Sequence, residues 1–320
     1  MNLTEYEAAM DPELREGFAR IAARFQNPPE DPVARRNQRL AIPTPPAPRD
    51  ERVRIEDRTV PGPPGAPEVP VRIYAPAERS GALPGMLWIH GGGFTAGTHT
   101  QNDALCQRFV TESGCLVVSA GYRLAPEHPF PAPPEDCYAA LRWLAGSAGE
   151  LGVDGGRIAI GGGSAGGGLA AGVALMARDR GEIPLVFELL IYPCLDDRHE
   201  TPSSHEIAAE GMVWYRDQSQ RGWRAYLGSD RPAEVSPYAA PARVVDVAGL
   251  PPTFLMVGTL DLMRDENIAY AQRLMQAGIA TELHVYPGAF HGFYTFVPEA
   301  PISRRATDEM VDALGRALRR

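Results

Sequence analysis

The sequence predicts an α/β fold in which a mostly parallel sheet is flanked by helices. Short apolar strands alternate with longer segments of helical periodicity, which is typical of parallel sheets. The six candidate strands are 86–91, 115–122, 157–162, 185–193, 253–261 and 281–288. Before them, Val53 and Ile55, and then Val69, Val71 and Ile73, alternate with polar residues on either side of PGPPGAP. This second pattern predicts an antiparallel hairpin.

The composition favours a soluble enzyme and excludes several classes of partner. The chain has 320 residues, 44% of them hydrophobic, so it can bury one large core. Its net charge of −9, without a basic run, argues against nucleic acid or an anionic membrane surface as partner. The sequence shows neither a secretory leader nor an apolar run of the roughly 20 residues that a membrane span needs, so we expect a cytoplasmic protein. A homodimer stays open, because no stretch identifies an interface.

Four cysteines stand singly in apolar surroundings. They are Cys106, Cys115, Cys137 and Cys194. Because no Cys-x-x-Cys spacing is present, we interpret them as buried free thiols and expect neither a metal site nor redox chemistry.

The N-terminal region and one long insertion complete the organisation. Asp11 and Pro12 are typical of a helix start, and apolar residues then recur at helical spacing at Leu14, Phe18, Ile21 and Phe25. The proline-rich stretch 28–48 is predicted to be an extended connector. An insertion of about sixty residues separates the strands 185–193 and 253–261, too long for a simple crossover. Its aromatic part, 211–228, is expected to form helices that cover the sheet edge together with the N-terminal helix.

The chemistry is indicated by two glycine-rich motifs about seventy residues apart, HGGGF at 90–94 and GGSAG at 162–166. Ser164 follows a strand and precedes a helix, the context that an activated serine requires. Gly162 and Gly166 let the backbone approach closely around it. The same stretch also spells G-x-G-x-x-G, the dinucleotide fingerprint, with Asp179 near the spacing of a ribose contact. That reading is disfavoured, because the motif lies in mid-chain and Asp179 ends the helix rather than the next strand.

The base and the acid are chosen by topology. Enzymes with such a serine carry nucleophile, acid and histidine in that chain order. Histidines before the serine, in the insertion or inside a strand are thereby set aside: His90, His99, His128, His199, His205 and His284. His291 remains, in a loop after the last strand. Asp261 ends the strand 253–261 at the edge where Ser164 lies, so it is preferred over Asp265, with Asp196 and Asp197 as remoter candidates.

A negative charge developing on a carbonyl oxygen needs backbone N–H donors about 3 Å away. The residue after the nucleophile, Ala165, is one candidate, and the HGGGF loop supplies Gly92 and Gly93. His90 is expected to brace this loop rather than to transfer protons.

With these residues placed, the chain resembles the bacterial hormone-sensitive-lipase-like (family IV) esterases of the α/β-hydrolase superfamily. The resemblance runs from about Met86 to Phe293. It rests on HGGGF, YRLAPEHPFPAP at 122–133, GGSAGG around Ser164, DLMRDE from Asp261 and HGF from His291, in the family's order. It implies an eight-stranded sheet, a helical cap and hydrolysis of short- to medium-chain acyl esters without a cofactor. The implied division is 1–50 as N-terminal cap segment and linker, 51–195 and 241–320 as the two parts of the catalytic domain, and 196–240 as cap insertion.

Two glycines depart from the family pattern. Gly163 stands where members usually carry Asp or Thr, and Gly168 where a larger polar residue is common. The missing side chains remove hydrogen bonds around the serine and put substrate subclass and efficiency in question.

The sequence therefore predicts a serine carboxylesterase acting on a small-molecule ester. Hydrolysis of a small amide, N-acyl group or lactone by the same residues stays an alternative, and a non-catalytic ligand-binding protein on this scaffold is a remote one. Residues that would line an acyl pocket are Met212, Trp214, Tyr215 and Phe94. The aromatic residues of the insertion fit the cap's own core equally well.

Overall fold

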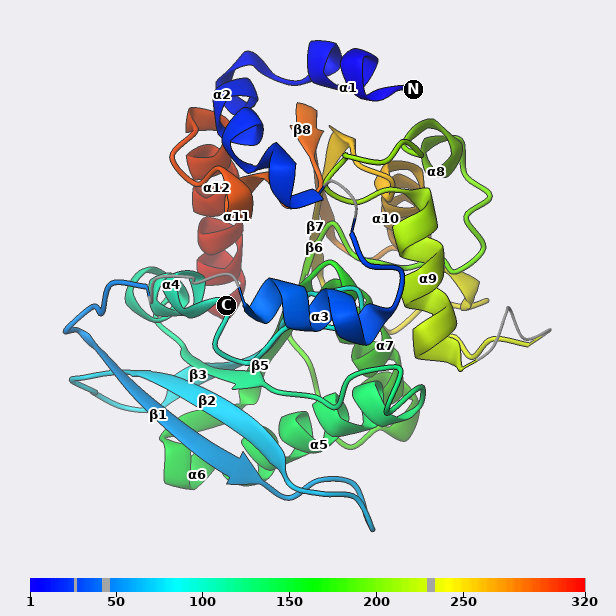
Figure 1. The fold of residues 1–320 in the computed structure, drawn as a ribbon. Coiled ribbons are helices and arrows are strands. Elements are labelled where there is room, and N and C mark those ends of the chain that lie inside the picture. The colour runs from blue at the N-terminus through cyan, green and yellow to red at the C-terminus, as the bar shows by residue number, and fades with distance from the viewer. Residues whose placement is uncertain (26–27, 42–46, 229–233, 320) are drawn as a thin grey trace.

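The computed structural model describes residues 1–25, 28–41, 47–228 and 234–319. One eight-stranded sheet organises them, in the order β1-β2-β4-β3-β5-β6-β7-β8 (Figure 1). The strands are β1 (Val53–Val60), β2 (Val69–Pro76), β3 (Leu83–Ile89), β4 (Leu116–Ala120), β5 (Val153–Gly163), β6 (Phe187–Ile191), β7 (Thr253–Leu260) and β8 (Thr281–Phe290). The predicted hairpin and all six predicted apolar strands are confirmed.

The sheet topology brings distant residues to one edge. β1 pairs with β2 and β2 with β4 in antiparallel fashion, whereas β3 to β8 pair in parallel. The carboxyl ends of parallel strands meet at one edge of a sheet. The HGGGF loop, Ser164, Asp261 and His291 all follow such ends, which is why they can form one site.

Helices cover both faces of the sheet. They are α4 (Asp103–Arg108), α5 (Ala132–Gly146), α6 (Ala148–Leu151), α7 (Ala165–Arg180), α10 (Arg264–Gln276), α11 (Phe293–Phe296) and α12 (Pro301–Leu318). Figure 1 shows α4 and α12 on one side, with α5, α7 and α10 on the other. The apolar faces expected for the helix after the serine and for the last helix are buried, at Leu169, Val173, Met176 and Ala177, and at Ile302, Ala306, Met310 and Leu314.

The described part of the N-terminal region holds three α-helices rather than one. Asp11 caps α2 (Pro12–Ile21) as predicted, its carboxylate accepting from Glu13 N at 2.8 Å. A short helix, α1 (Leu3–Ala9), precedes it; its capping box of Asn2 and Glu5 is a signal that the sequence carried.

The prediction of an extended connector over 28–48 is wrong where the structure describes it, because α3 spans Pro32–Leu40. The prolines flank this helix instead of interrupting it. Pro32 opens its first turn, where the missing N–H costs nothing, and the Asp31 carboxylate accepts from Ala34 N at 2.7 Å. Residues 42–46 of the predicted connector lie outside the described residues.

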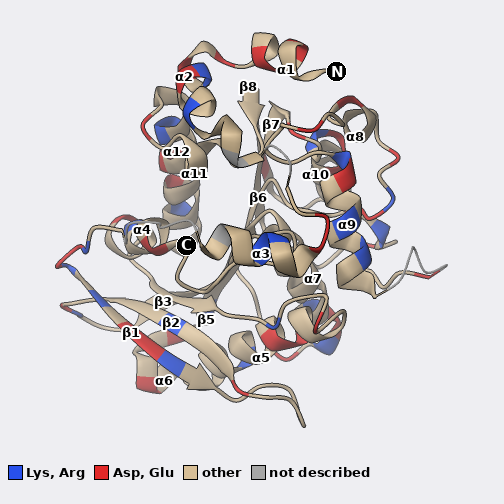
Figure 2. Ribbon diagram, in the orientation of Figure 1, with Lys and Arg blue, Asp and Glu red and all other residues tan. Residues whose placement is uncertain are grey.

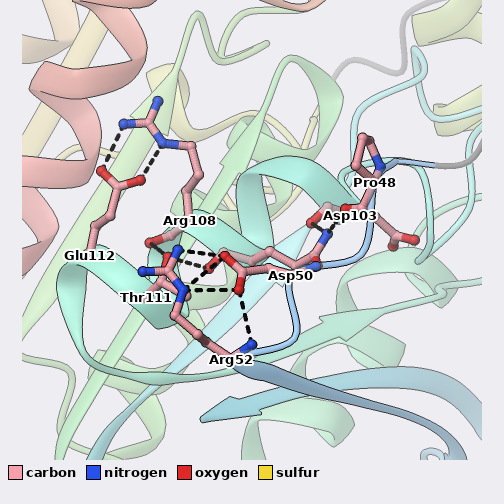
Figure 3. A network of polar contacts seen from close by, with 8 residues as sticks. Pro48, Asp50, Arg52, Asp103, Arg108, Thr111 and Glu112 are labelled. Carbon is pink, nitrogen blue, oxygen red and sulfur yellow. Dashed lines mark hydrogen bonds and ion pairs between the residues drawn. The ribbon is translucent and has the colours of Figure 1, made fainter. Parts of the chain in front are cut away.

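The connector is then anchored at its end by α4 (Figure 3). Gln107, which is buried, accepts a hydrogen bond from Asp50 N at 2.7 Å and donates to the Pro48 carbonyl at 3.2 Å. The Arg52 guanidinium pairs with the Asp50 carboxylate beside it. The chain is thus fixed immediately before β1 begins.

The insertion between β6 and β7 carries α8 (Pro202–Glu206) and α9 (Arg216–Leu227). α9 contacts α3 of the N-terminal region, and Arg221 reaches Glu30 at 3.3 Å. The two segments predicted to form a cap therefore touch each other. Their division from the rest of the chain as a separate unit stays a prediction.

Charges of both signs are interspersed over the surface elements (Figure 2). Arg72, for example, lies between Asp57 at 2.7 Å and Asp103 at 2.9 Å. Within the described residues, no helix combines the length and apolarity that crossing a membrane requires.

Candidate active site

Ser164 lies on a strained turn between β5 and α7. Its φ of 58° and ψ of −124° are unfavourable for a residue with a side chain. The neighbouring glycines make the turn fit: a Cβ on Gly162 would lie 2.3 Å from Gly166 O, and one on Gly166 would lie 2.1 Å from Ile89 O. The turn therefore requires both glycines, as predicted, and it leaves the Ser164 hydroxyl accessible at the sheet edge.

Ser164, His291 and Asp261 form a continuous chain of hydrogen bonds. Ser164 Oγ lies 2.9 Å from His291 Nε2, and His291 Nδ1 lies 2.8 Å from Asp261 Oδ2. The second carboxylate oxygen of Asp261 accepts from Met263 N at 3.0 Å. Asp261 is fully buried, and the His291 side chain is 9% exposed. A carboxylate on Nδ1 fixes the tautomer in which Nε2 accepts the serine proton.

The other acids considered from the sequence bond elsewhere. Asp265 accepts from Ser203 N at 2.7 Å and pairs with Arg264. Asp197 is held by Arg243, its carboxylate 2.6 Å from Nε. Asp196 pairs with its own neighbour, Arg198. Asp179, the ribose candidate of the disfavoured reading, pairs with Arg178 and accepts from Tyr238.

The HGGGF loop lies directly against the serine turn. A Cβ on Gly91 would approach Gly163 O to 2.7 Å and the Ser164 Cβ to 3.2 Å. Gly92 and Gly93 follow with φ values of 133° and 62°, conformations that favour glycine. Ala165 opens α7, where the first N–H groups have no partner within the helix.

His90 contacts this loop and its neighbour Tyr122. Its Nδ1 lies 2.9 Å from Gly91 O, and its ring stacks on Tyr122 with a centroid distance of 4.3 Å. Tyr122 in turn donates to the His90 carbonyl at 3.0 Å. Burial lowers the pKa of His90 to about 4, so the ring is neutral near pH 7. A neutral, buried ring fits the bracing role expected from the sequence.

The four residues predicted to line an acyl pocket lie in different environments. The Trp214 ring lies 6.1 Å from that of His291, and a Cβ on Gly93 would meet the edge of the indole at 2.6 Å. Phe94 stacks on Tyr226 at 4.1 Å and belongs to an aromatic cluster of the insertion. Met212 is fully buried, and Tyr215 is 5% exposed. Trp214 therefore lies close to both the histidine and the glycine loop.

Three further residues beside the site escaped sequence reasoning. Tyr192, with φ of 36°, lies 4.6 Å from the His291 ring. Cys194 Sγ lies 3.8 Å from Ser164 Oγ. Tyr6 of α1 is fully buried; burial and the charge of Asp261 raise its pKa. Tyr192 and Cys194 lie within three residues of the end of β6, so the rule that pointed to Asp261 could also have found them.

The two unusual glycines have different surroundings. A Cβ on Gly168 would lie 2.1 Å from Cys194 O, so this close contact of α7 with the next loop requires glycine. A Cβ on Gly163 would meet nothing closer than 3.8 Å, where it faces Tyr192 and Tyr294. Gly168 is thus a packing requirement, whereas Gly163 leaves room beside the nucleophile.

Comparison with known proteins agrees with this geometry. The family model described as alpha/beta hydrolase fold matches residues 86–295. Carboxylesterase NlhH of Mycobacterium tuberculosis is 39% identical over 273 residues, 83% of each chain. Ethyl acetate hydrolase of Pseudomonas putida is 33% identical over 70% of this chain and 71% of its own. A solved structure titled Bacterial Heroin Esterase superposes with a TM-score of 0.89 at 41% identity, over 98% of this chain and 99% of that one. The chain therefore belongs to the hormone-sensitive-lipase-like esterases of the α/β-hydrolase superfamily, a family of carboxylic ester hydrolases.

Proposed function

We propose that this carboxylic ester hydrolase cleaves short- to medium-chain acyl esters through an acyl-enzyme formed on Ser164. The observation that carries the proposal is the unbroken hydrogen-bond chain from Ser164 through His291 to Asp261. Each link has a length at which proton transfer or tautomer fixing operates. Two observations support a short acyl group. The indole of Trp214 packs against Gly93 of the glycine loop and so limits the space there, and one relative is named ethyl acetate hydrolase.

The proposed reaction proceeds in two halves. Ser164 Oγ attacks the ester carbonyl carbon while its proton passes to His291 Nε2, and Asp261 stabilises the imidazolium. The oxyanion is held by the N–H groups of Gly92, Gly93 and Ala165. The tetrahedral intermediate collapses, and the leaving alkoxide takes the proton from His291. A water molecule, deprotonated by the same histidine, then attacks the acyl-enzyme and releases the acid and free Ser164.

A p-nitrophenyl ester series from acetyl to dodecanoyl tests the proposal. We expect kcat/KM to be highest for short chains and to vanish in Ser164→Ala. Asp261→Asn should lower kcat by about four orders of magnitude, because the imidazole adopts the wrong tautomer. Asp265→Asn is the matched control, since this carboxylate bonds Ser203 N instead of the histidine. Turnover that survives Ser164→Ala, or wild-type protein that cleaves no ester, would refute the proposal.

The cellular setting is proposed on narrower grounds. All four cysteines are buried free thiols, as the sequence predicted, and unpaired thiols are usual in the reducing cytoplasm. Localisation of a tagged chain in its native cell tests this. The homodimer that the sequence leaves open stays a prediction, which light scattering after size-exclusion chromatography decides.

A further inference from the structure

The loop that follows β6 lies between the nucleophile and α10. Its central residue, Cys194, donates from its backbone N to the Ser164 carbonyl at 3.1 Å and has its Sγ 3.8 Å from Ser164 Oγ. On its other side, the Cys194 carbonyl packs against Gly168 of α7 so closely that a Cβ on Gly168 would lie 2.1 Å from Cys194 O. A shift of Cys194 therefore displaces the backbone of Ser164.

Both peptide groups next to Cys194 are held by α10. Glu266 Oε1 accepts from Leu195 N at 2.8 Å and from Asp196 N at 3.3 Å. Asn267 Nδ2 donates to Pro193 O at 2.8 Å. Glu266 is 7% exposed and Asn267 is fully buried. These bonds are thus shielded from competing water, and they grip the loop before and after the residue that contacts the nucleophile.

The same helix is joined to the acid of the triad. α10 begins at Arg264, three residues after Asp261, and Arg264 N donates back to Asp261 O at 3.1 Å. Its helical backbone fixes Glu266 relative to Asp261, and Glu266 fixes the loop relative to Ser164. The acid and the nucleophile, which come from different strands, are thereby joined by a continuous series of short contacts.

We propose that Glu266 and Asn267 are positioning residues that set the separation between Ser164 and the Asp261–His291 pair. The inference rests on the triad proposed above. In the sequence DLMRDEN, Asp261 at the start is the acid of the proposed triad. Glu266 and Asn267 at the end hold the loop around Cys194, which contacts Ser164. Misplacing reacting groups by about 1 Å costs on the order of a hundredfold in rate.

The carboxyl group of Glu266 can be replaced by an amide that keeps its acceptor oxygen. Burial raises the pKa of this carboxyl, and nearby Asp196 and Asp261 raise it further. Glutamine presents a carbonyl oxygen to the same two N–H groups and has nearly the same size. Glu266→Gln should therefore keep the grip on the loop, whereas Glu266→Leu fills the volume and removes the acceptor.

The test compares kcat and KM for p-nitrophenyl acetate in these variants. We expect Glu266→Leu to lower kcat about 10- to 100-fold with KM within about threefold, and Glu266→Gln to stay within about threefold in both. Glu188→Leu is the control: this glutamate is also buried, but it bonds Thr253, at the opposite end of the neighbouring strand from Asp261. Circular dichroism and the unfolding midpoint identify variants that are folded.

A second readout separates this inference from the proposed function. The rate at which a fluorophosphonate labels Ser164 depends on activation of the serine and not on ester turnover. It should fall in Glu266→Leu and recover in Glu266→Gln. Asn267→Ala, which removes the Pro193 bond, should lower the rate in the same way and carries the test if Glu266→Leu does not fold. The inference would be overturned if folded Glu266→Leu or Asn267→Ala kept the kcat and labelling rate of the wild type, or if Glu188→Leu lost as much activity as Glu266→Leu. If the wild-type protein cleaved no ester, the proposed function would be overturned instead.

Discussion

Replacing Glu188 with glutamine is expected to stabilise the protein, and more so as the pH rises. Glu188 lies on β6 with no exposed surface. Its Oε2 accepts from Thr253 Oγ1 at 3.1 Å, whereas Oε1 has no hydrogen-bond partner among the described residues. Burial raises the pKa of this carboxyl to about 8, although the hydrogen bond from Thr253 acts to lower it. The folded protein therefore holds Glu188 as a neutral acid near pH 7.

The magnitude follows from the difference between the folded and unfolded states. In the unfolded chain the pKa of Glu188 returns to its ordinary value of 4.5. Below that pH both states are protonated. Between pH 4.5 and 8 the unfolded state releases the proton and the folded state keeps it, so the free energy of unfolding falls as pH rises. At pH 7 the two states differ over about 2.5 pH units, which at about 1.36 kcal/mol per unit amounts to roughly 3 kcal/mol.

Urea unfolding of the wild type and Glu188→Gln between pH 5 and 8 measures this effect. Glutamine does not ionise, so its advantage should be about 1 kcal/mol or less at pH 5 and approach 3 kcal/mol at pH 7. Glu51→Gln, at an exposed position, should follow the wild-type curve. If the Glu188→Gln and wild-type curves run parallel across this range, Glu188 does not keep its proton in the folded state and the reasoning is wrong.

Two further predictions concern close packing at Gly168 and the hydrogen bonds of Gln107. Gly168→Ala should destabilise the protein by about 1–3 kcal/mol and reduce ester hydrolysis, because the new methyl group overlaps Cys194 O; Gly163→Ala has room and should raise the free energy of unfolding by about 0.5 kcal/mol. Urea unfolding of the two variants checks this, and equal effects would contradict it. Gln107→Ala should cost about 1 kcal/mol, since it removes the hydrogen bonds that buried Gln107 makes to Asp50 N and the Pro48 carbonyl, while Arg52→Ala at the exposed neighbouring pair should leave the unfolding midpoint unchanged. A midpoint for Gln107→Ala equal to that of the wild type would show that α4 does not anchor the connector.

The sequence was most informative where local pattern and topology agree. The strands could be read from their apolar runs, because a strand buried on both faces has few polar residues. Asp261 and His291 then followed from chain order and from the rule that parallel strands end at one edge. The structure places both within hydrogen-bond reach of their neighbours in the proposed triad.

Features that depend on contacts between distant segments were out of reach. Composition drew attention to the prolines around α3, but only their positions at its ends show that a helix fits between them. Glycine is needed at Gly168 because Cys194 O packs closely against α7, and no local sequence pattern encodes this contact. The grip of Glu266 on the loop after β6 likewise joins residues 71 positions apart.

The contacts of α2 have a consequence for how the chain is made. Asp11 N donates to Gly288 O, and Ile302 N donates to the carboxylate of Glu13, 289 residues earlier. At about 5–20 residues per second, the ribosome needs roughly 15 to 60 s to supply these partners after α2 has emerged. During that time Phe18 lacks Phe290, whose ring it contacts at a centroid distance of 5.4 Å. α2 is therefore made long before the partners that hold it, and it is among the last helices to reach its native contacts.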